Sequence, residues 1–491
     1  MIEAGTLDVS LISHTKAGKT TLARTLLGRD VGEVRDAPHV TAEATPYTLQ
    51  ETDAGDRLVL WDTPGFGDSA RLARRLRQQG NPIGWFLSAV WDRYRDRTFW
   101  LTQLAVRNVR EHADAVLYLV NAAEAPADAG YLAPELEVLD WIGKPVIVLL
   151  NQTGPPKGRA DEAADEARWR DALGRWGKVR DVLTLDAFAR CWVQERTLFA
   201  ALARALPDAK RPVLDRLVAA WTARRRAQFD AAVAALAGPI ARAAVDREVL
   251  PADPLLAKLS RSLGLGRTMG ASPEDDAARA LGERLAADLE AGNGELIAVH
   301  GLQGRAAAEV ARRLATDVRT EAPVDEGKAA VMGGLVSGAL TGLTADLAAG
   351  GLTFGAGMLA GAVLGALGAA GVARGVNVAR GRTDATVRWD DTFLDGLVAS
   401  ALLRYLAVAH YGRGRGEWTE GEYPAFWRDL VTRTVVARQA EFDAVWALRS
   451  GADAAAVERA LGAAMAGAAR ALLDALYPGA LDDAEPASSG K

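Results

Sequence analysis

The strongest constraint on the fold is a short run of residues near the N-terminus. It lies between a β-prone segment, residues 7–12, and a helix-prone segment, residues 20–27, and reads Ser13-His14-Thr15-Lys16-Ala17-Gly18-Lys19-Thr20. The pattern is that of a phosphate-binding loop, G-x-x-x-x-G-K-S/T, with serine in the place of the first glycine. A loop between a strand and a helix directs backbone N–H groups and the positive end of the helix at a phosphate. The sequence therefore predicts an α/β nucleotide-binding domain.

The residues of this loop have different predicted roles. Lys19 is expected to reach the β- and γ-phosphates, and the hydroxyl of Thr20 is expected to hold Mg²⁺. The other residues from Ser13 to Gly18, with Thr21 at the start of the helix, are expected to surround the phosphates.

A second motif follows at a suitable distance. The β-prone segment 57–61 ends in Asp62-Thr63-Pro64-Gly65, a D-x-x-G element. A carboxylate at the end of a strand beside the phosphate loop can hold the Mg²⁺ shell, which makes Asp62 a predicted metal residue. The N–H of Gly65 is expected to contact the γ-phosphate, so that this loop responds to hydrolysis. The two motifs together are far more specific than either alone.

With these motifs, residues 5–150 resemble the translation-factor class of small G domains, in the branch of Era-like and ribosome-assembly GTPases. The phrases that carry the likeness are His-Thr-Lys-Ala-Gly-Lys-Thr, Gly-Glu-Val-Arg-Asp-Ala-Pro and Trp-Asp-Thr-Pro-Gly-Phe-Gly-Asp-Ser. The full chain resembles a bacterial family that joins this G domain to a helical C-terminal domain of unknown function. The resemblance implies a mostly parallel six-stranded sheet with helices on both faces, binding of GTP and GDP with Mg²⁺, and slow GTP hydrolysis without a partner.

The resemblance also implies a threonine that closes over Mg²⁺ from the loop after the first helix. Thr41 is the candidate, as a metal ligand and catalytic residue, and Thr45 is the alternative. Phe66 follows the D-x-x-G element where classical signalling G proteins have glutamine, and the Era-like branch also has an apolar residue there.

The base-recognition element departs from its usual form. After the β-prone segment 144–150, Asn151-Gln152-Thr153-Gly154 stands where N-K-x-D is expected. Asn151 matches and Gln152 can lie along a base, but Gly154 replaces the aspartate that accepts two hydrogen bonds from guanine. Losing that pair costs about a few kcal/mol of base discrimination, so the choice between guanine and adenine stays open. Asp186 and Ala187 follow the last strand, where the final base-contacting loop belongs.

A G domain over residues 1–205 includes an insertion at about 69–112. Arginines in its first helix could act as an arginine finger across a homodimer, which would make a second copy a partner. The favoured interpretation is a solvated helix followed by an amphipathic docking helix.

The rest of the chain is predicted to be all-α, with helical regions at 206–328 and 375–480 and a disordered tail at 481–491. Residues 329–374 are predicted to form a Gly/Ala-rich helical hairpin whose arms meet along glycines spaced four apart. Either this glycine-zipper hairpin contacts a membrane, or it is the buried centre of the C-terminal domain. Membrane contact is slightly favoured, although Asp346 opposes insertion by about 3 kcal/mol if it lies deep.

Charge and cysteine usage restrict the remaining alternatives. The net charge of −5 gives no electrostatic case for a nucleic-acid partner, and one cysteine, Cys191, excludes a disulfide framework. Residues 1–8 lack a basic region followed by an apolar run, so we expect a cytoplasmic protein, held at the inner membrane if the hairpin inserts.

Lys16 leads to a prediction about monovalent cations. Relatives of this branch often have asparagine there, which in some supports a cation near the transferring phosphate. If the Lys16 ammonium replaces that cation, steady-state GTP hydrolysis should be equal in KCl and NaCl. A requirement for K⁺ would instead identify Lys16 as a solvated loop lysine, which is the favoured interpretation.

Overall fold

The structure, a computed structural model, describes residues 4–14, 17–28, 44–66, 68–78, 96–153, 159–185, 191–249, 273–302, 372–376, 385–411, 425–451 and 454–478. The chain divides into two compact units. The first contains the described residues up to 227, and the second contains most of those from 228 onward. Each unit is described separately below.

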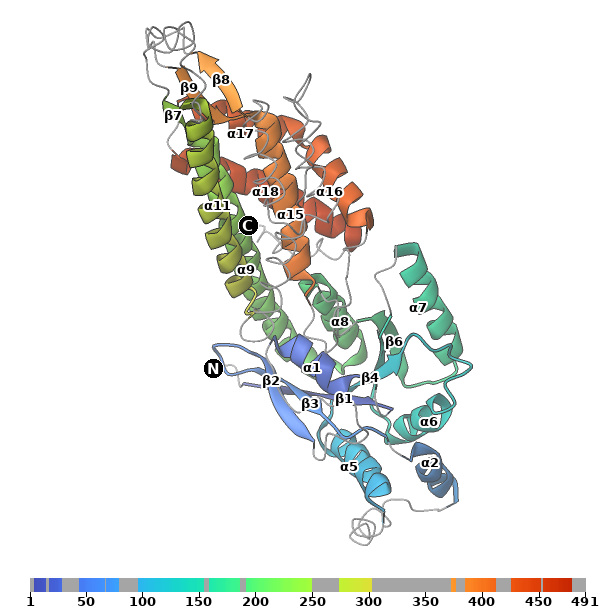
Figure 1. The fold of residues 1–491 in the computed structure, drawn as a ribbon. Coiled ribbons are helices and arrows are strands. Elements are labelled where there is room, and N and C mark those ends of the chain that lie inside the picture. The colour runs from blue at the N-terminus through green and yellow to red at the C-terminus, as the bar shows by residue number, and fades with distance from the viewer. Residues whose placement is uncertain are drawn as a thin grey trace, which may run out of the picture. The chain divides into compact units, whose positions relative to one another are not determined.

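A six-stranded sheet forms the centre of the first unit, in the order β2-β3-β1-β4-β5-β6 (Figure 1). The antiparallel strand β2 pairs with β3, and all other neighbours are parallel. This confirms the predicted mostly parallel sheet. The strands are β1 (Thr6–Ser13), β2 (Thr45–Glu51), β3 (Arg57–Asp62), β4 (Ala115–Asn121), β5 (Val146–Asn151) and β6 (Val179–Thr184).

Helices cover both faces of this sheet because successive strand residues point to opposite sides. Leu11 of β1 packs in the core formed with α1 (Lys19–Leu27), α8 (Trp192–Ala205) and the first part of α9 (Arg211–Val245). Its neighbour Ile12 packs in the opposite core. That core includes residues of α2 (Ser69–Gln78), α5 (Arg97–His112), α6 (Leu132–Ile142) and α7 (Arg159–Leu173).

An ion pair ties α9 to the turn between β2 and β3. The buried carboxylate of Asp56 accepts two 2.7 Å hydrogen bonds from Arg216 and one of 2.9 Å from the N–H of Gly5. The hydrogen bonds from Arg216 are the largest cause that holds the pKa of Asp56 well below its usual range. The first compact unit therefore includes α9 residues that lie beyond the range 1–205 predicted from sequence.

The second unit is mostly helical, as predicted. Its helices are the later part of α9, α11 (Pro273–Val299), α15 (Asp391–Ala409), α16 (Ala425–Ala437), α17 (Gln439–Ala447) and α18 (Ala454–Leu476). A small antiparallel sheet, not predicted from sequence, has the order β7-β9-β8. Its strands are β7 (Glu248–Val249), β8 (Val372–Val376) and β9 (Ala385–Trp389).

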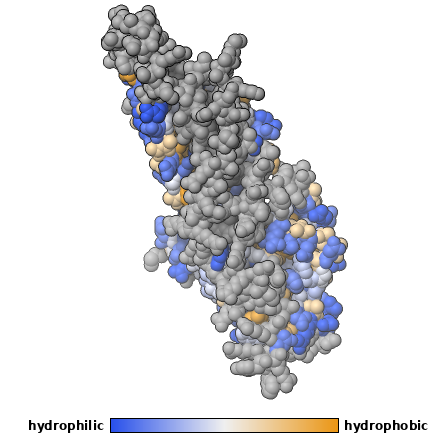
Figure 2. All heavy atoms as spheres, in the orientation of Figure 1, coloured by the Kyte–Doolittle hydropathy of each residue, from blue (hydrophilic) through white to orange (hydrophobic). Residues whose placement is uncertain are grey.

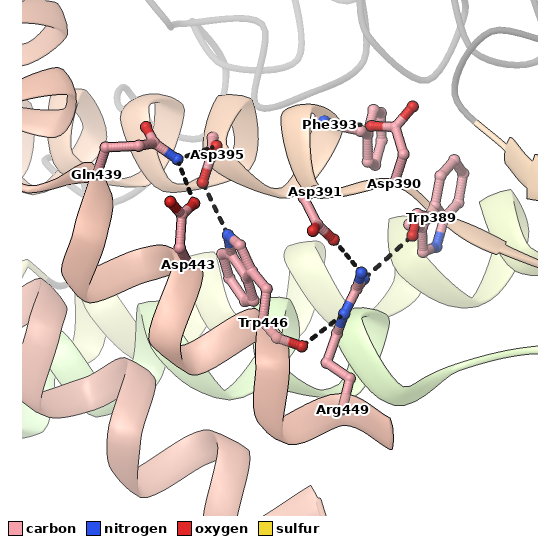
Figure 3. A network of polar contacts seen from close by, with 9 residues as sticks. All are labelled: Trp389, Asp390, Asp391, Phe393, Asp395, Gln439, Asp443, Trp446 and Arg449. Atoms are coloured by element: carbon pink, nitrogen blue, oxygen red, sulfur yellow. Dashed lines mark hydrogen bonds and ion pairs between the residues drawn. The ribbon is translucent and has the colours of Figure 1, made fainter. Parts of the chain in front are cut away.

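A polar network joins α15 to α17 and to the residues after it (Figure 3). Asp395 accepts hydrogen bonds from the indole of Trp446 at 2.8 Å and from the Gln439 amide at 2.7 Å. Arg449 donates to the carbonyl of Trp389 at 3.1 Å and pairs with Asp391. Burial raises the pKa of Asp395, and these two donors oppose that shift. The network therefore holds the start of α15 against α17 and the residues that follow it.

The structure describes little of the segment that is predicted to contact a membrane. Residues 329–371 of the predicted hairpin lie outside it, and residues 372–374 belong to β8. Among the described helices, α15 is long and apolar enough to cross a membrane, but it is mostly buried inside the fold, like a core helix. On the face in view, the described surface is mainly hydrophilic, with hydrophobic residues scattered over it (Figure 2).

The pair between Asp56 and Arg216 yields a stability prediction. Arg216→Met leaves a buried carboxylate without its guanidinium, so the midpoint of thermal unfolding at pH 7 should fall by several degrees. Because the pKa of Asp56 is lowered, the pair contributes fully above the pKa of an unfolded aspartate and loses its contribution as the pH falls through the lower folded value. The destabilisation should therefore be smaller at acidic pH.

The control for this prediction is Arg57→Gln. Arg57 and Glu51 form an ion pair in which both side chains are about half exposed, and such pairs contribute little. Calorimetry of both variants should place Arg57→Gln close to the wild type. Equal midpoints for the two variants would contradict the assigned role of Asp56.

Candidate functional site

The phosphate loop leaves β1 at Ser13 and enters α1 at Lys19. Gly18 precedes the helix in the left-handed region, with φ 88°, and no side chain caps this helix end. No acidic residue lies in the first turn of α1. Because the first N–H groups and the positive end of the dipole point out of the helix, this end of α1 suits an anion.

Gly18 is required here by conformation and by space. An L-residue with a side chain is strained at a positive φ. A Cβ at this position would also lie 2.7 Å from the amide nitrogen of Asn151. Only glycine therefore fits the last turn of the loop.

Lys19 extends into a buried environment beside the start of the loop. Its Nζ donates a 3.3 Å hydrogen bond to Oγ of Ser13, the residue in the place of the usual first glycine. Burial lowers the pKa of Lys19, and the charges of Asp62 and Glu135 oppose that shift. Since burial penalises an ammonium, a bound phosphate would stabilise the charged form.

Two of the three residues expected to hold Mg²⁺ meet where β3 ends beside the first turn of α1. Oδ2 of Asp62 accepts a 2.8 Å hydrogen bond from the hydroxyl of Thr20. Oδ1 of the same carboxylate is buried and has no hydrogen-bond partner among the described residues. An unpaired buried carboxylate oxygen beside a threonine hydroxyl fits a hard divalent cation, because such ions take oxygen ligands. Burial also raises the pKa of Asp62, and a cation would oppose that shift.

The D-x-x-G segment is tied closely to β1. The hydroxyl of Thr63 donates to the carbonyl of Leu11 at 2.8 Å, and the N–H of Phe66 donates to the carbonyl of Ser13 at 2.9 Å. Gly65 lies buried between these two anchors. The ring of Phe66 is fully buried in the core shared with α2, α5 and α6. It therefore cannot orient a water molecule as a glutamine would.

The base-recognition segment also supports the phosphate loop. The Asn151 amide donates a 2.8 Å hydrogen bond to the carbonyl of Ala17, and its side chain is buried. Gln152, the next residue, has φ 58°, an unusual conformation for a residue other than glycine. The contact from β5 thus fixes the backbone just before Gly18.

The structure brings together most of the predicted site. Ser13, Gly18, Lys19, Thr20, Asp62 and Asn151 make the contacts above, and Thr21 is buried in α1. His14, Ala17, Gly65 and Gln152 are also described, in the same segments. The other predicted residues lie outside the described part of the chain: Thr15, Lys16, Thr41, Asp186 and Ala187.

Sequence reasoning missed one residue of this neighbourhood, Glu135 in the first turn of α6. It is fully buried and bonds to the ring of His14 in the phosphate loop. A signal was present, because Glu135 lies on the same helix face as Leu132, Val138 and Leu139. A carboxylate on an apolar face indicates a buried polar contact.

Comparisons with known families agree with this geometry. Residues 8–152 match the family model "50S ribosome-binding GTPase", and residues 315–469 match "Domain of unknown function (DUF3482)". One part of the chain is therefore similar to a family of GTPases, and a separate part is similar to a family of unknown function. The GTPase domain contains the phosphate loop, the D-x-x-G element and Asn151.

Curated relatives match about a third of the chain. GTPase Der of Mycobacterium tuberculosis is 29% identical over 166 residues, which are 34% of this chain and 29% of that protein. GTPase Der of Deinococcus deserti is 27% identical over 152 residues, 30% of this chain and 27% of that protein. The match thus spans less than a third of each of these relatives.

Solved structures also match parts of the chain, at lower identity. Aquifex aeolicus Era bound to GDP.AlF4- is 17% identical, with a TM-score of 0.30, over 41% of this chain and 57% of that one. Era in complex with MgGDPNP and a segment of 16S ribosomal RNA gives the same identity and TM-score over 42% and 58%.

Gly18 provides a test of the loop. Gly18→Ala adds about 1–2 kcal/mol of left-handed strain and a clash with Asn151, so GTP affinity should fall at least about tenfold. The matched control is Gly28→Ala at the end of α1, which has φ 65° and no atom within 4 Å of the added Cβ. Fluorescent-nucleotide titration should show wild-type affinity for this control. Equal affinities for the two variants would mean that the geometry at Gly18 does not set binding.

Proposed function

We propose that the GTPase domain binds GTP with Mg²⁺ and hydrolyses it to GDP and phosphate. The observation that carries this proposal is the convergence of Lys19, Thr20 and Asp62 at the N-terminus of α1. It lies within the residues that match the GTPase family model. The chain spans a minor part of its curated relatives, so the activity of the whole protein is inferred from this site.

The proposed mechanism relies on positioning and charge neutralisation. Backbone N–H groups at the start of α1 would surround the phosphates, and Lys19 would pair with the β- and γ-phosphate oxygens. Thr20 and Asp62 would hold the metal, with Thr41 as the candidate third residue. Bound there, Mg²⁺ would neutralise charge on the phosphate oxygens. The N–H of Gly65 would contact the γ-phosphate and so register its loss.

Slow turnover without a partner follows from Phe66. Its ring is buried and its N–H is bonded to Ser13, so this position supplies no polar group to the attacking water. Faster hydrolysis would need a group from elsewhere, such as a second copy or a protein partner. If no such group is supplied, the domain would bind the nucleotide and hydrolyse almost none of it. The protein would then act as a nucleotide-gated scaffold, which is the alternative to a GTPase.

We further propose that the nucleotide state is coupled to the helical C-terminal domain, and that residues 329–374 contact a membrane. Sedimentation with vesicles of bacterial inner-membrane lipids, with GTP or GDP, tests both parts. Wild-type sedimentation that depends on the nucleotide would support them. Sedimentation unchanged by removal of residues 329–371 would overturn the assignment of the hairpin.

Ribosome assembly is the second candidate, because the matching family is described as ribosome-binding. The net charge of −5 favours a different partner, since RNA binding usually needs a basic surface. Co-sedimentation with ribosomes in the presence of a non-hydrolysable GTP analogue would decide between them.

Nucleotide affinity is the deciding test of the proposal. Titrations with GTP, GDP and ATP in Mg²⁺ should show guanine binding that Lys19→Ala weakens at least about a hundredfold. Equal ATP binding would mean that the Asn151-Gln152-Thr153-Gly154 element does not select guanine. Absence of binding by the wild-type chain would overturn the proposal.

A further inference from the structure

Glu135 is a buried carboxylate for which the mechanism above has no use. It lies in the first turn of α6, where the helix dipole favours a negative charge. Its side chain is fully buried, and burial raises the pKa of Glu135 while the contact with His14 opposes that shift. Burying a carboxylate is costly unless hydrogen bonds satisfy it, so its partners indicate what it does.

Three elements form hydrogen bonds with this one side chain. The Oε1 atom lies 2.7 Å from Nδ1 of His14 in the phosphate loop and accepts a 3.4 Å hydrogen bond from the hydroxyl of Ser69 at the start of α2. The Oε2 atom accepts a 2.7 Å hydrogen bond from Tyr118 of β4. Of these, Tyr118 belongs to a strand, whereas His14 lies in the phosphate loop and Ser69 begins the helix after the D-x-x-G element, the two segments expected to flank a γ-phosphate.

His14 is held on its other side as well. Its ring stacks on that of Tyr131, with centroids 4.3 Å apart and planes 15° from parallel. Its backbone forms an isolated parallel bridge with Phe66, three residues before Ser69. His14 therefore joins the phosphate loop to Phe66 through the backbone and to the start of α2 through Glu135. These contacts add to the hydrogen bond between Thr20 and Asp62.

The other end of α2 is attached differently. Arg77 donates two hydrogen bonds to Glu137, also of α6, but the Arg77 side chain is 63% exposed. Exposed ion pairs contribute little, so this contact holds α2 against α6 only weakly. Two glutamates, two residues apart on α6, thus hold the two ends of α2, and only the one at Glu135 also touches the phosphate loop.

We propose that Glu135 is a positioning residue that couples the phosphate loop to α2 by holding His14 and Ser69 on one buried carboxylate. If a γ-phosphate displaces the phosphate loop or α2, the contact between Glu135 and the other segment then changes. The inference rests on the proposed GTPase function for its purpose, but the coupling itself is a property of the protein without nucleotide.

The first experiment therefore uses the nucleotide-free full chain. Glu135→Gln preserves size but replaces one acceptor with a donor, and Glu137→Gln is its matched control. Hydrogen–deuterium exchange should rise about tenfold in both the phosphate loop and the first turn of α2 for Glu135→Gln. For Glu137→Gln, only the end of α2 near Arg77 should exchange faster.

Two further variants remove the partners of Glu135 one at a time. They keep the inference testable if Glu135→Gln does not fold. His14→Gln should raise exchange at the start of α2, and Ser69→Ala should raise it in the phosphate loop. If each variant changes only its own segment, the two segments are not coupled through Glu135, and the inference is wrong.

The second experiment separates this inference from the proposed function. In single-turnover assays, Glu135→Gln should hydrolyse GTP about tenfold more slowly while its GTP affinity stays within about threefold of the wild type. Glu137→Gln should match the wild type in both measurements. Normal hydrolysis by Glu135→Gln would overturn the inference and leave the GTPase proposal intact. If the wild type binds no nucleotide, the GTPase proposal falls, and the exchange data alone decide the coupling.

Discussion

The parallel pairing of β1 with β3 on one side and β4 on the other is the constraint on which the site depends. It places Leu11 opposite Asp62, and Ser13 opposite Leu119, so the carboxyl ends of three strands reach the same edge of the sheet. The phosphate loop, the Asp62 carboxylate and the strand that carries Tyr118 therefore start from fixed positions. Ligands of open α/β sheets bind at this edge.

Several ionisable side chains are buried at this edge of the sheet. Lys19, Asp62 and Glu135 all lie in an environment where burial disfavours their charged forms. A charged group in such a place is stabilised only by specific partners. Asp62 keeps one oxygen unpaired among the described residues, whereas hydrogen bonds reach both oxygens of Glu135. The unpaired oxygen of Asp62 suits a site that a cation completes. The satisfied carboxylate of Glu135 suits a structural contact that persists without a ligand.

The sequence predicted what depends on local spacing. The strand–loop–helix unit around Lys19 and the D-x-x-G turn follow from short motifs beside hydrophobic runs, and the mostly parallel sheet was implied by the family resemblance that those motifs carry. It did not predict Glu135, whose partners lie 121 and 66 residues away along the chain. Nor did it predict β7, β8 and β9, because strands of two and five residues leave little periodic signal and pair across long separations. Nor did it predict a role for Asp56, whose buried carboxylate binds Arg216.

Asn151 stands in the element expected to recognise the base, and it also supports the phosphate loop. This combination affects which changes of sequence the domain can tolerate. The Asn151 amide holds the carbonyl of Ala17, a task that is independent of which base is bound. Gly154 stands at the other end of the same element, where the N-K-x-D pattern has its aspartate. The contact of Asn151 with Ala17 does not depend on that aspartate. A lineage that abandoned guanine altogether would still be under selection to keep this asparagine, as long as it kept a phosphate.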